Sequence, residues 1–191
     1  MKIAILGTRG IPNNHGGFEQ FAEHFSVYLA SKNHDVYVYN SHDHPYQDKK
    51  FKGVNIIHAY DPEHKIGTVG QFIYDLNCIL DSRKRKFDAI LQLGYTSSSV
   101  WFKLLPKEAI IITNMDGMEW KRSKYSSSVR KFLMYAERLA VKSSNFLISD
   151  SIGIQDYILK KYNRVSEFIA YGATVFKTPN EKALSRYAVK I

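Results

Sequence analysis

The chain has 191 residues, a formal net charge of +9, 45% apolar residues and one cysteine. This length is enough for one sizeable core, while a single cysteine excludes an internal disulfide framework and is typical of a reducing cytoplasm. No apolar run approaches the roughly 20 residues that a membrane-spanning helix needs. The positive charge indicates an acidic partner, which could be a phosphorylated substrate, anionic lipid or nucleic acid.

Strands and helices are predicted to alternate along the chain. The predicted strands are at residues 2–6, 35–39, 54–58, 89–93, 109–113, 146–149 and 167–170. The predicted helices start near Phe18, run over 66–86 and 127–142, and follow Ser151, with a short one near 97–99, while residues 40–53 are expected to be irregular. This alternation predicts an α/β fold, in which a Rossmann-like parallel sheet carries helices on both faces.

A glycine-rich loop at residues 7–17 joins the first strand to the first helix. A strand, a glycine-rich loop and a helix in this order favour a phosphate site, because bare N–H groups and the positive helix end face one small volume. Arg9 adds a fixed cation, and Gly16 with Glu19 is expected to cap the helix. The spacing is neither G-x-G-x-x-G nor a P-loop, so a loop that needs glycine only for its turn stays an alternative.

Four stretches of the chain, in order, resemble a group of bacterial glycosyltransferases. They are Gly7-Thr8-Arg9-Gly10-Ile11-Pro12 with Gly16-Gly17-Phe18-Glu19, then Asn114 to Arg122, then Ala140-Val141-Lys142 leading to Ser149-Asp150-Ser151, and Phe168 to Ala173. The resemblance is to the rhamnosyltransferase-like subgroup of family 4, which has the GT-B fold and a domain of unknown function 1972. It covers essentially the whole chain.

The resemblance implies the N-terminal half of a two-domain enzyme. Residues 1–173 would form the acceptor-side domain, and residues 174–191 would be the linker to a donor-binding domain. The enzyme would be a retaining hexosyltransferase without cofactor or metal, and this fragment alone would be inactive. It would move a sugar, such as rhamnose, from a dTDP-, UDP- or GDP-sugar to a glycan or lipid-linked acceptor in cell-surface polysaccharide synthesis. The expected location is cytoplasmic, peripheral on the inner face of the plasma membrane, with an anionic membrane surface as a further partner.

The predicted site lies beyond the carboxyl ends of the strands, where parallel sheets bind ligands. For the donor diphosphate, the predicted residues are Arg9, His15, Gly16 and Gly17. For catalysis they are Asp116, as the acceptor-side carboxylate, and Glu119. For the acceptor they are Tyr95, Asn114, Trp120 and Arg122. Alternatives stay open at three places: Asp116 could cap a turn, Trp120 could belong to the core, and Glu119 could pair with Arg122.

Two other functions are weighed against the transferase. A nucleotide-binding module without transferase activity, of the oxidoreductase kind, needs an acidic residue at the end of the second strand, where Asn40 stands. A domain that binds nucleic acid or another anion could use the basic clusters at 83–86 and 121–131, but no known nucleic-acid motif accompanies them, so no nucleic acid is expected. His42 and His44 lack the partners of a metal site, and none is expected.

Overall fold

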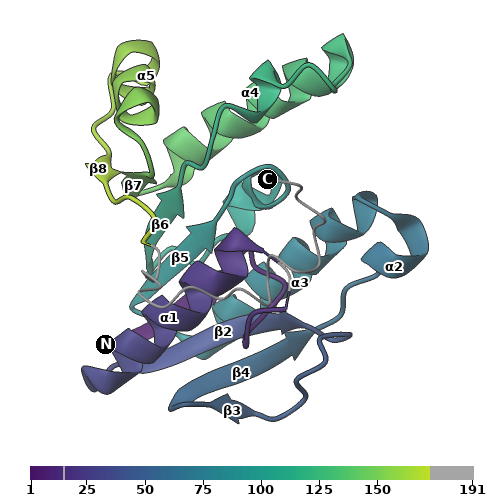
Figure 1. Cartoon of the computed structure of the whole chain (residues 1–191), viewed down its shortest axis with the longest axis vertical. Coiled ribbons are helices and arrows are strands. Elements are labelled where there is room, and N and C mark those ends of the chain that lie inside the picture. The colour runs from purple at the N-terminus through teal and green to yellow at the C-terminus, as the bar shows by residue number, and fades with distance from the viewer. Residues whose placement is uncertain (15, 173–191) are drawn as a thin grey trace, which may run out of the picture.

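The computed structural model of the protein describes residues 1–14 and 16–172 (Figure 1). His15 and the predicted linker at 174–191 therefore lie outside the described residues. Among the described helices, none combines the length and the apolar character needed to cross a membrane.

The described strands form one eight-stranded sheet in the order β3-β4-β2-β1-β5-β6-β7-β8. All neighbouring strands are parallel except β3, which is antiparallel to β4. The strands are β1 (Lys2–Leu6), β2 (Asp35–Ser41), β3 (Lys50–Phe51), β4 (Val54–Ala59), β5 (Ala89–Leu93), β6 (Ile110–Asn114), β7 (Phe146–Ser149) and β8 (Glu167–Phe168). The strand order changes direction beside β1, where open α/β sheets bind ligands.

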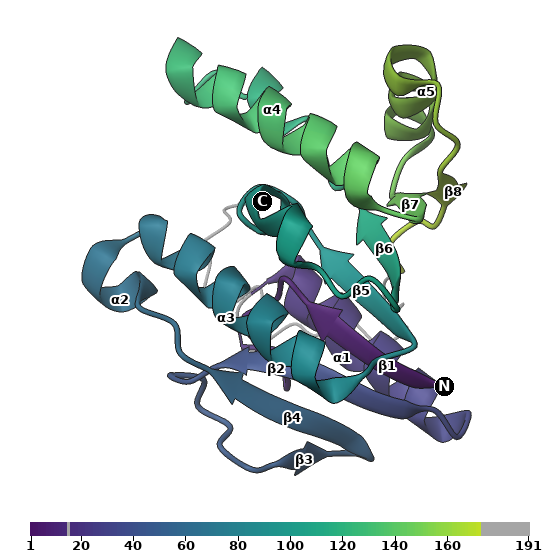
Figure 2. The same cartoon turned by 180° about the vertical axis from the view of Figure 1, so that it is seen from behind.

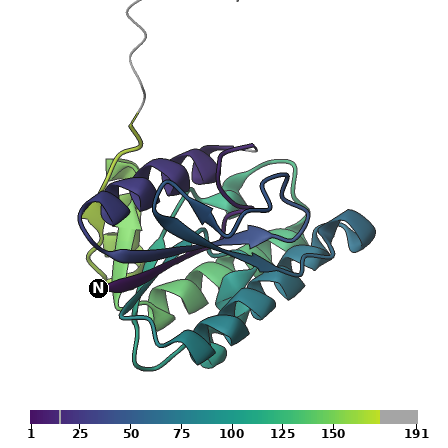
Figure 3. The same cartoon turned by 90° about the horizontal axis from the view of Figure 1, so that it is seen from below.

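Helices cover both faces of the sheet, as predicted. Figure 3 shows α1 on one side and α3 and α4 on the other, and Figure 2 shows α3 and α4 lying across the sheet from behind. The helices are α1 (Gly17–Ser31), α2 (Glu63–Ile66), α3 (Val69–Arg85), α4 (Ser127–Ser143) and α5 (Ile152–Tyr162), with 3-10 turns η1 (Ser98–Leu104) and η2 (Glu119–Lys121). The predicted α/β, Rossmann-like fold is confirmed.

Alternating side chains of the central strands build two cores. On β1, Ile5 packs with Ala22 of α1, whereas Ala4 and Leu6 pack on the other face with Cys78 and Ile79 of α3. This is the period of two that a strand buried on both faces requires. A third core joins α4 and α5 to the β7 end of the sheet.

The structure departs from the predicted elements in two places. The helix predicted at 66–86 starts only at Val69 and is preceded by the separate short helix α2, because Gly67 between them has a φ of +65°, which a helix cannot contain. The segment predicted to be irregular contains the short edge strand β3. Its two residues are too few to show an alternating pattern in the sequence.

Candidate ligand-binding site

Two of the loop glycines are required by close packing of the backbone. Gly7 has a φ of +81°, and an added Cβ would lie 2.2 Å from the carbonyl oxygen of Leu93 on β5. Gly10 has a φ of +129°, and its Cβ would lie 2.4 Å from Cγ of Asn40 on β2. The Asn40 amide in turn accepts from Ile11 N–H at 3.0 Å and donates to Ile11 O at 2.8 Å. The loop is thereby held against the carboxyl ends of β5 and β2.

Glu19 does not close the helix cap as predicted. Gly16 is the N-cap of α1, but the Glu19 carboxylate accepts instead from the N–H of Arg9 at 2.9 Å and from the Thr8 hydroxyl at 3.3 Å. The reason is that the buried carboxylate, 7% exposed, needs strong donors, and the loop supplies them. The loop N–H of Arg9 is therefore already occupied, and the first turn of α1 is left as the place where N–H groups lack intrahelical acceptors.

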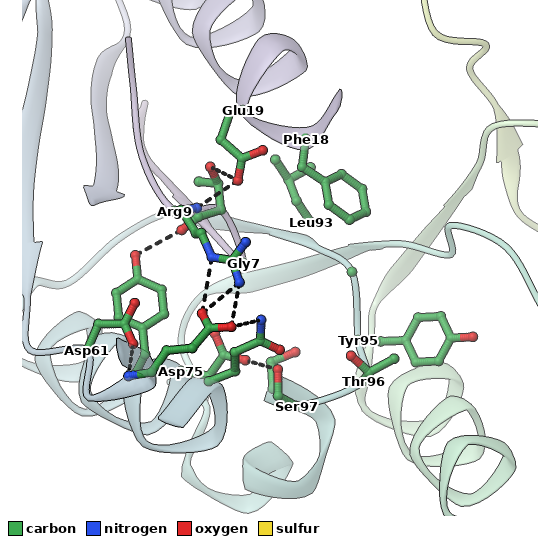
Figure 4. Close-up of a pocket in the computed structure, with 16 residues that line it drawn as sticks. Gly7, Arg9, Phe18, Glu19, Asp61, Asp75, Leu93, Tyr95, Thr96 and Ser97 are labelled. Carbon is green, nitrogen blue, oxygen red and sulfur yellow. Dashed lines mark hydrogen bonds and ion pairs between the residues drawn. The ribbon is translucent and has the colours of Figure 1, made fainter. Parts of the chain in front are cut away.

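The predicted phosphate cation is held in an ion pair. Arg9 donates through Nη2 to Glu63 Oε1 at 2.6 Å and through Nε to Glu63 Oε2 at 3.1 Å (Figure 4). Gln71 on α3 donates to the same carboxylate at 3.1 Å. This pairing joins the glycine-rich loop to α2, and it neutralises the charge that an anionic ligand would meet.

A cavity of about 190 Å³ lies beneath this ion pair, between the glycine-rich loop, α3 and the turn after β5. Its carboxylates, in chain order, are Glu19, Asp61, Glu63 and Asp75. Burial, with a smaller contribution from Asp61, raises the pKa of Asp75 to about 7. The Ser97 hydroxyl donates to Asp75 (Figure 4). The cavity is polar and acidic although the chain as a whole is strongly basic.

Asp116 lies in a second cavity of about 420 Å³, at the carboxyl end of β6 between α3 and α4. Burial first, and then Asp150 after the neighbouring strand β7, raise the pKa of Asp116 to about 6. The two carboxylates are adjacent because Met115 N–H bonds to Ile148 O across these strands at 2.8 Å. Glu119 and Tyr95 line the same cavity, so the structure brings three of the predicted residues together.

The remaining predicted acceptor residues form hydrogen bonds or ion pairs with other side chains of the protein. Arg122 pairs with Glu119 at 2.8 Å, which is the alternative that the sequence left open. Trp120 donates to the buried Glu137 at 3.1 Å and lies beside Tyr157 of α5. Asn114 is 4% exposed and donates to the Tyr171 hydroxyl at 2.8 Å. Their roles toward a ligand stay predictions.

Tyr95 is fixed inside the protein, whereas Gly16 and Gly17 border open space. Tyr95 is buried, and its hydroxyl donates to Gly117 O at 3.2 Å. A Cβ added at Gly17 would meet nothing within 4 Å, and one at Gly16 would meet only the Glu19 carboxylate at 3.3 Å. The space beside the first turn of α1 is thus open to an approaching group.

Three potential metal ligands meet at the rim of the sheet. Ligand atoms of His42, Asp43 and His64 lie within 4.8 Å of one another. Nδ1 of His42, however, accepts from Asp61 N–H at 3.0 Å, so the ring proton belongs on Nε2, which lies 3.1 Å from Asp43 Oδ1. The three side chains are therefore joined by hydrogen bonds in this structure, and the absence of a metal site stays a prediction.

Sequence reasoning missed Asp61, Glu63 and Asp75. Asp61 follows β4 at the carboxyl edge of the sheet, so the rule that located Asp116 could have located it too. Asp75 lies inside α3, where a single carboxylate has no sequence signal, and only the contact with Ser97 reveals that it faces inward.

Known proteins give matches of two kinds. A family model described as "Domain of unknown function (DUF1972)" matches residues 1–174. Among solved structures, a sucrose-phosphate synthase from Thermosynechococcus elongatus matches at 13% identity and a TM-score of 0.69, over 99% of this chain and 53% of that one. A shorter chain of the same synthase matches at 14% identity and a TM-score of 0.56, over 90% of this chain and 88% of that one. No curated protein sequence matches.

The likeness to the synthase, at these identities, is one of fold. The chain spans about half the length of the longer synthase chain, 53% of it. The family match is of a different kind, because it rests on sequence and covers nearly the whole chain, residues 1–174 of 191. The chain therefore belongs to the family of domains of unknown function 1972.

Proposed function

We propose that this chain is the acceptor-side domain of a GT-B glycosyltransferase. The observation that carries the proposal is the fold shared with a sugar-transferring enzyme over 99% of the chain. The stretches that resemble family 4 transferases support it further, because the glycine-rich loop, Asn114 to Arg122 and Ser149-Asp150-Ser151 follow the carboxyl ends of β1, β6 and β7, at the edge of the sheet where the two cavities lie. The chain would act together with a second, donor-binding domain.

In this proposal the enzyme transfers a sugar from a nucleotide-sugar to an acceptor hydroxyl. The bond between the anomeric carbon and the diphosphate oxygen breaks, and a bond from that carbon to the acceptor oxygen forms. The first turn of α1 would stabilise the negative leaving group, because its N–H groups and the helix dipole point toward an anion. The donor could be dTDP-rhamnose, and the acceptor a glycan or a lipid-linked glycan.

Asp116 would interact with the acceptor hydroxyl during the reaction. With a pKa near 6, its carboxylate is mostly ionised at neutral pH and can accept a hydrogen bond from the acceptor hydroxyl. Asp116 could orient that hydroxyl or receive its proton. In either role the ionised form is needed, so the rate should fall as the pH drops through about 6.

The test uses the full-length protein that contains this chain. It is mixed in turn with dTDP-rhamnose, UDP-glucose and GDP-mannose and a lipid-linked glycan acceptor, and release of nucleoside diphosphate is measured between pH 5 and 8. We expect release with one donor, lost by about 100-fold or more in Asp116→Asn and retained in the matched surface variant Asp156→Asn. Donor binding without release under any condition would favour the nucleotide-binding module instead.

A further inference from the structure

We propose that Glu137 of α4 is a positioning residue that holds the segment at residues 115–122 in place through Trp120. This segment carries Asp116, so the proposal deepens the proposed function and rests on it for one point, namely that Asp116 interacts with the acceptor. The positioning itself follows from the contacts of Glu137 and from the place of Trp120 in the segment.

Glu137 is a buried carboxylate that accepts hydrogen bonds from two parts of the chain. It is 2% exposed. Its Oε2 accepts from Nε1 of Trp120, in η2, at 3.1 Å. Its Oε1 accepts from three side chains of α5, namely Tyr157 at 2.6 Å, Lys161 at 2.9 Å and Tyr162 at 2.5 Å. One oxygen therefore serves the segment between β6 and α4, and the other serves α5.

The surroundings of this carboxylate make each donor important. A buried charge is tolerated only when it is paired and hydrogen-bonded, and hydrogen bonds to a charged group are about twice as strong as those between neutral groups. Lys161 supplies the opposite charge, and its Nζ also lies 5.3 Å from the ring centroid of Trp120. Nζ of Lys121 lies 5.5 Å from the same centroid. The indole is thus held both through its N–H group and through its ring.

Trp120 lies four residues after Asp116, and a second hydrogen bond fixes the segment between them. The Tyr95 hydroxyl donates to Gly117 O at 3.2 Å. Asp116 lines the cavity of about 420 Å³, whereas Trp120 and Glu137 do not line it. An effect of Glu137 on this cavity must therefore pass through the segment, which is what distinguishes a positioning residue from one that touches a ligand.

The chain offers a matched pair of variants for this role. Trp120→Phe and Tyr162→Phe each remove one donor from Glu137 and keep an aromatic ring at the position. Only Trp120 belongs to the segment that carries Asp116, because Tyr162 is the last residue of α5. A carboxylate that serves stability alone would make the two variants alike, whereas a positioning residue makes them differ at residues 115–122.

The first measurement is amide hydrogen exchange of the full-length protein without substrate, followed by mass spectrometry over residues 115–122. We expect Trp120→Phe to speed exchange there about tenfold, because the segment loses a hydrogen bond to a charged group. Tyr162→Phe should change it by less than about twofold. Equal changes in the two variants, or no change in either, would overturn the proposal.

The second measurement is the pH profile of nucleoside diphosphate release in Glu137→Gln. The glutamine has one amide oxygen in place of two carboxylate oxygens, and the cation of Lys161 competes for it, so Trp120 loses its acceptor. The segment is then less firmly held, and Asp116 becomes more hydrated. We expect kcat/KM to fall about tenfold at neutral pH.

The same variant should also shift the pH at which the rate falls. Burial first, and then Asp150 and Glu119, raise the pKa of Asp116 to about 6, whereas Arg122 lowers it. Because hydration removes the largest of these causes, the acid limb should move from about pH 6 toward the ordinary value of 3.8. Tyr162→Phe should leave the acid limb in place. An equal loss of rate at every pH in Glu137→Gln would show a merely structural role and contradict the proposal.

The outcome for Glu137 can be separated from the outcome for the transferase, because hydrogen exchange requires no reaction. Faster exchange in Trp120→Phe than in Tyr162→Phe, without release of nucleoside diphosphate from any donor, would keep the positioning of the segment and contradict the proposed function. Release by the wild-type protein, with equal exchange in the two variants, would keep the transferase and contradict the positioning role.

Discussion

Asp75 shows how a single buried carboxyl group links the cavity to stability. Burial raises its pKa from 3.8 to about 7, so the native state favours the protonated form. The stability that this form provides is fully present below pH 4 and is lost as the pH rises through 7. Wild-type protein should lose roughly 2–3 kcal/mol more than Asp75→Asn between pH 5 and pH 8, as urea unfolding would measure. Parallel losses in the two proteins would mean that the Asp75 carboxyl is solvated.

The Arg9–Glu63 pair suggests a second prediction at the residue scale. Glu63 holds the guanidinium bidentately, at 2.6 and 3.1 Å, so an incoming diphosphate must compete with it. Glu63→Gln should therefore raise the affinity for nucleoside diphosphates about fivefold, measured by calorimetry on the full-length protein. The double variant Arg9→Gln/Glu63→Gln should lose this gain, and the surface variant Glu108→Gln should show none. An unchanged affinity in Glu63→Gln would mean that Arg9 does not face the donor.

At the scale of elements, the glycine-rich loop contains a glycine that the packing requires, Gly7, whereas Gly17 at the start of α1 is not required by packing. Gly7→Ala places a Cβ 2.2 Å from a backbone carbonyl at a φ of +81°, and neither strand can yield without breaking the sheet. We expect it to cost at least about 2 kcal/mol or to prevent folding. Gly17→Ala meets open space and should change stability by less than about 1 kcal/mol. Thermal unfolding of both variants tests this, and equal losses would contradict the packing argument.

The elements also show what the sequence could and could not predict. The main parallel strands were predictable because runs such as Ile110-Ile111-Ile112 are apolar on both faces. The role of Glu19 was not predictable. Its spacing from Gly16 favours a helix cap, whereas its carboxylate accepts from Thr8 and Arg9 in the preceding loop. The pairing of Arg9 with Glu63 joins residues 54 positions apart, and no local pattern encodes it. Asp116 and Asp150 were both predictable at the carboxyl edge, because each follows a strand, but that their carboxyl groups interact is known only from the pairing of β6 with β7.

At the scale of the whole molecule, two exposed basic clusters of the described residues lie at different edges of the sheet. Lys121, Lys124 and Lys131 lie at η2 and the start of α4, beside the Asp116 cavity. The other cluster, residues 83–86, lies at the opposite edge of the sheet, because Lys2 at the start of β1 donates to Arg85 O at 2.7 Å. Of these two clusters, only the one at η2 and α4 lies on the same edge of the sheet as the predicted site, so that both could face a membrane together.

This arrangement predicts oriented binding to anionic membranes. Reversing the charge of Lys121, Lys124 and Lys131 to Glu should weaken binding to phosphatidylglycerol-containing vesicles at least tenfold, because each basic residue near a membrane surface contributes about 1 kcal/mol. Reversing Arg83, Lys84 and Lys86 changes the net charge equally and should have a much smaller effect. Binding is measured by co-sedimentation, and salt should weaken it, as screening of exposed charges requires. Equal losses in the two triple variants would show that net charge alone attracts the protein, and that neither edge of the sheet is turned toward the membrane.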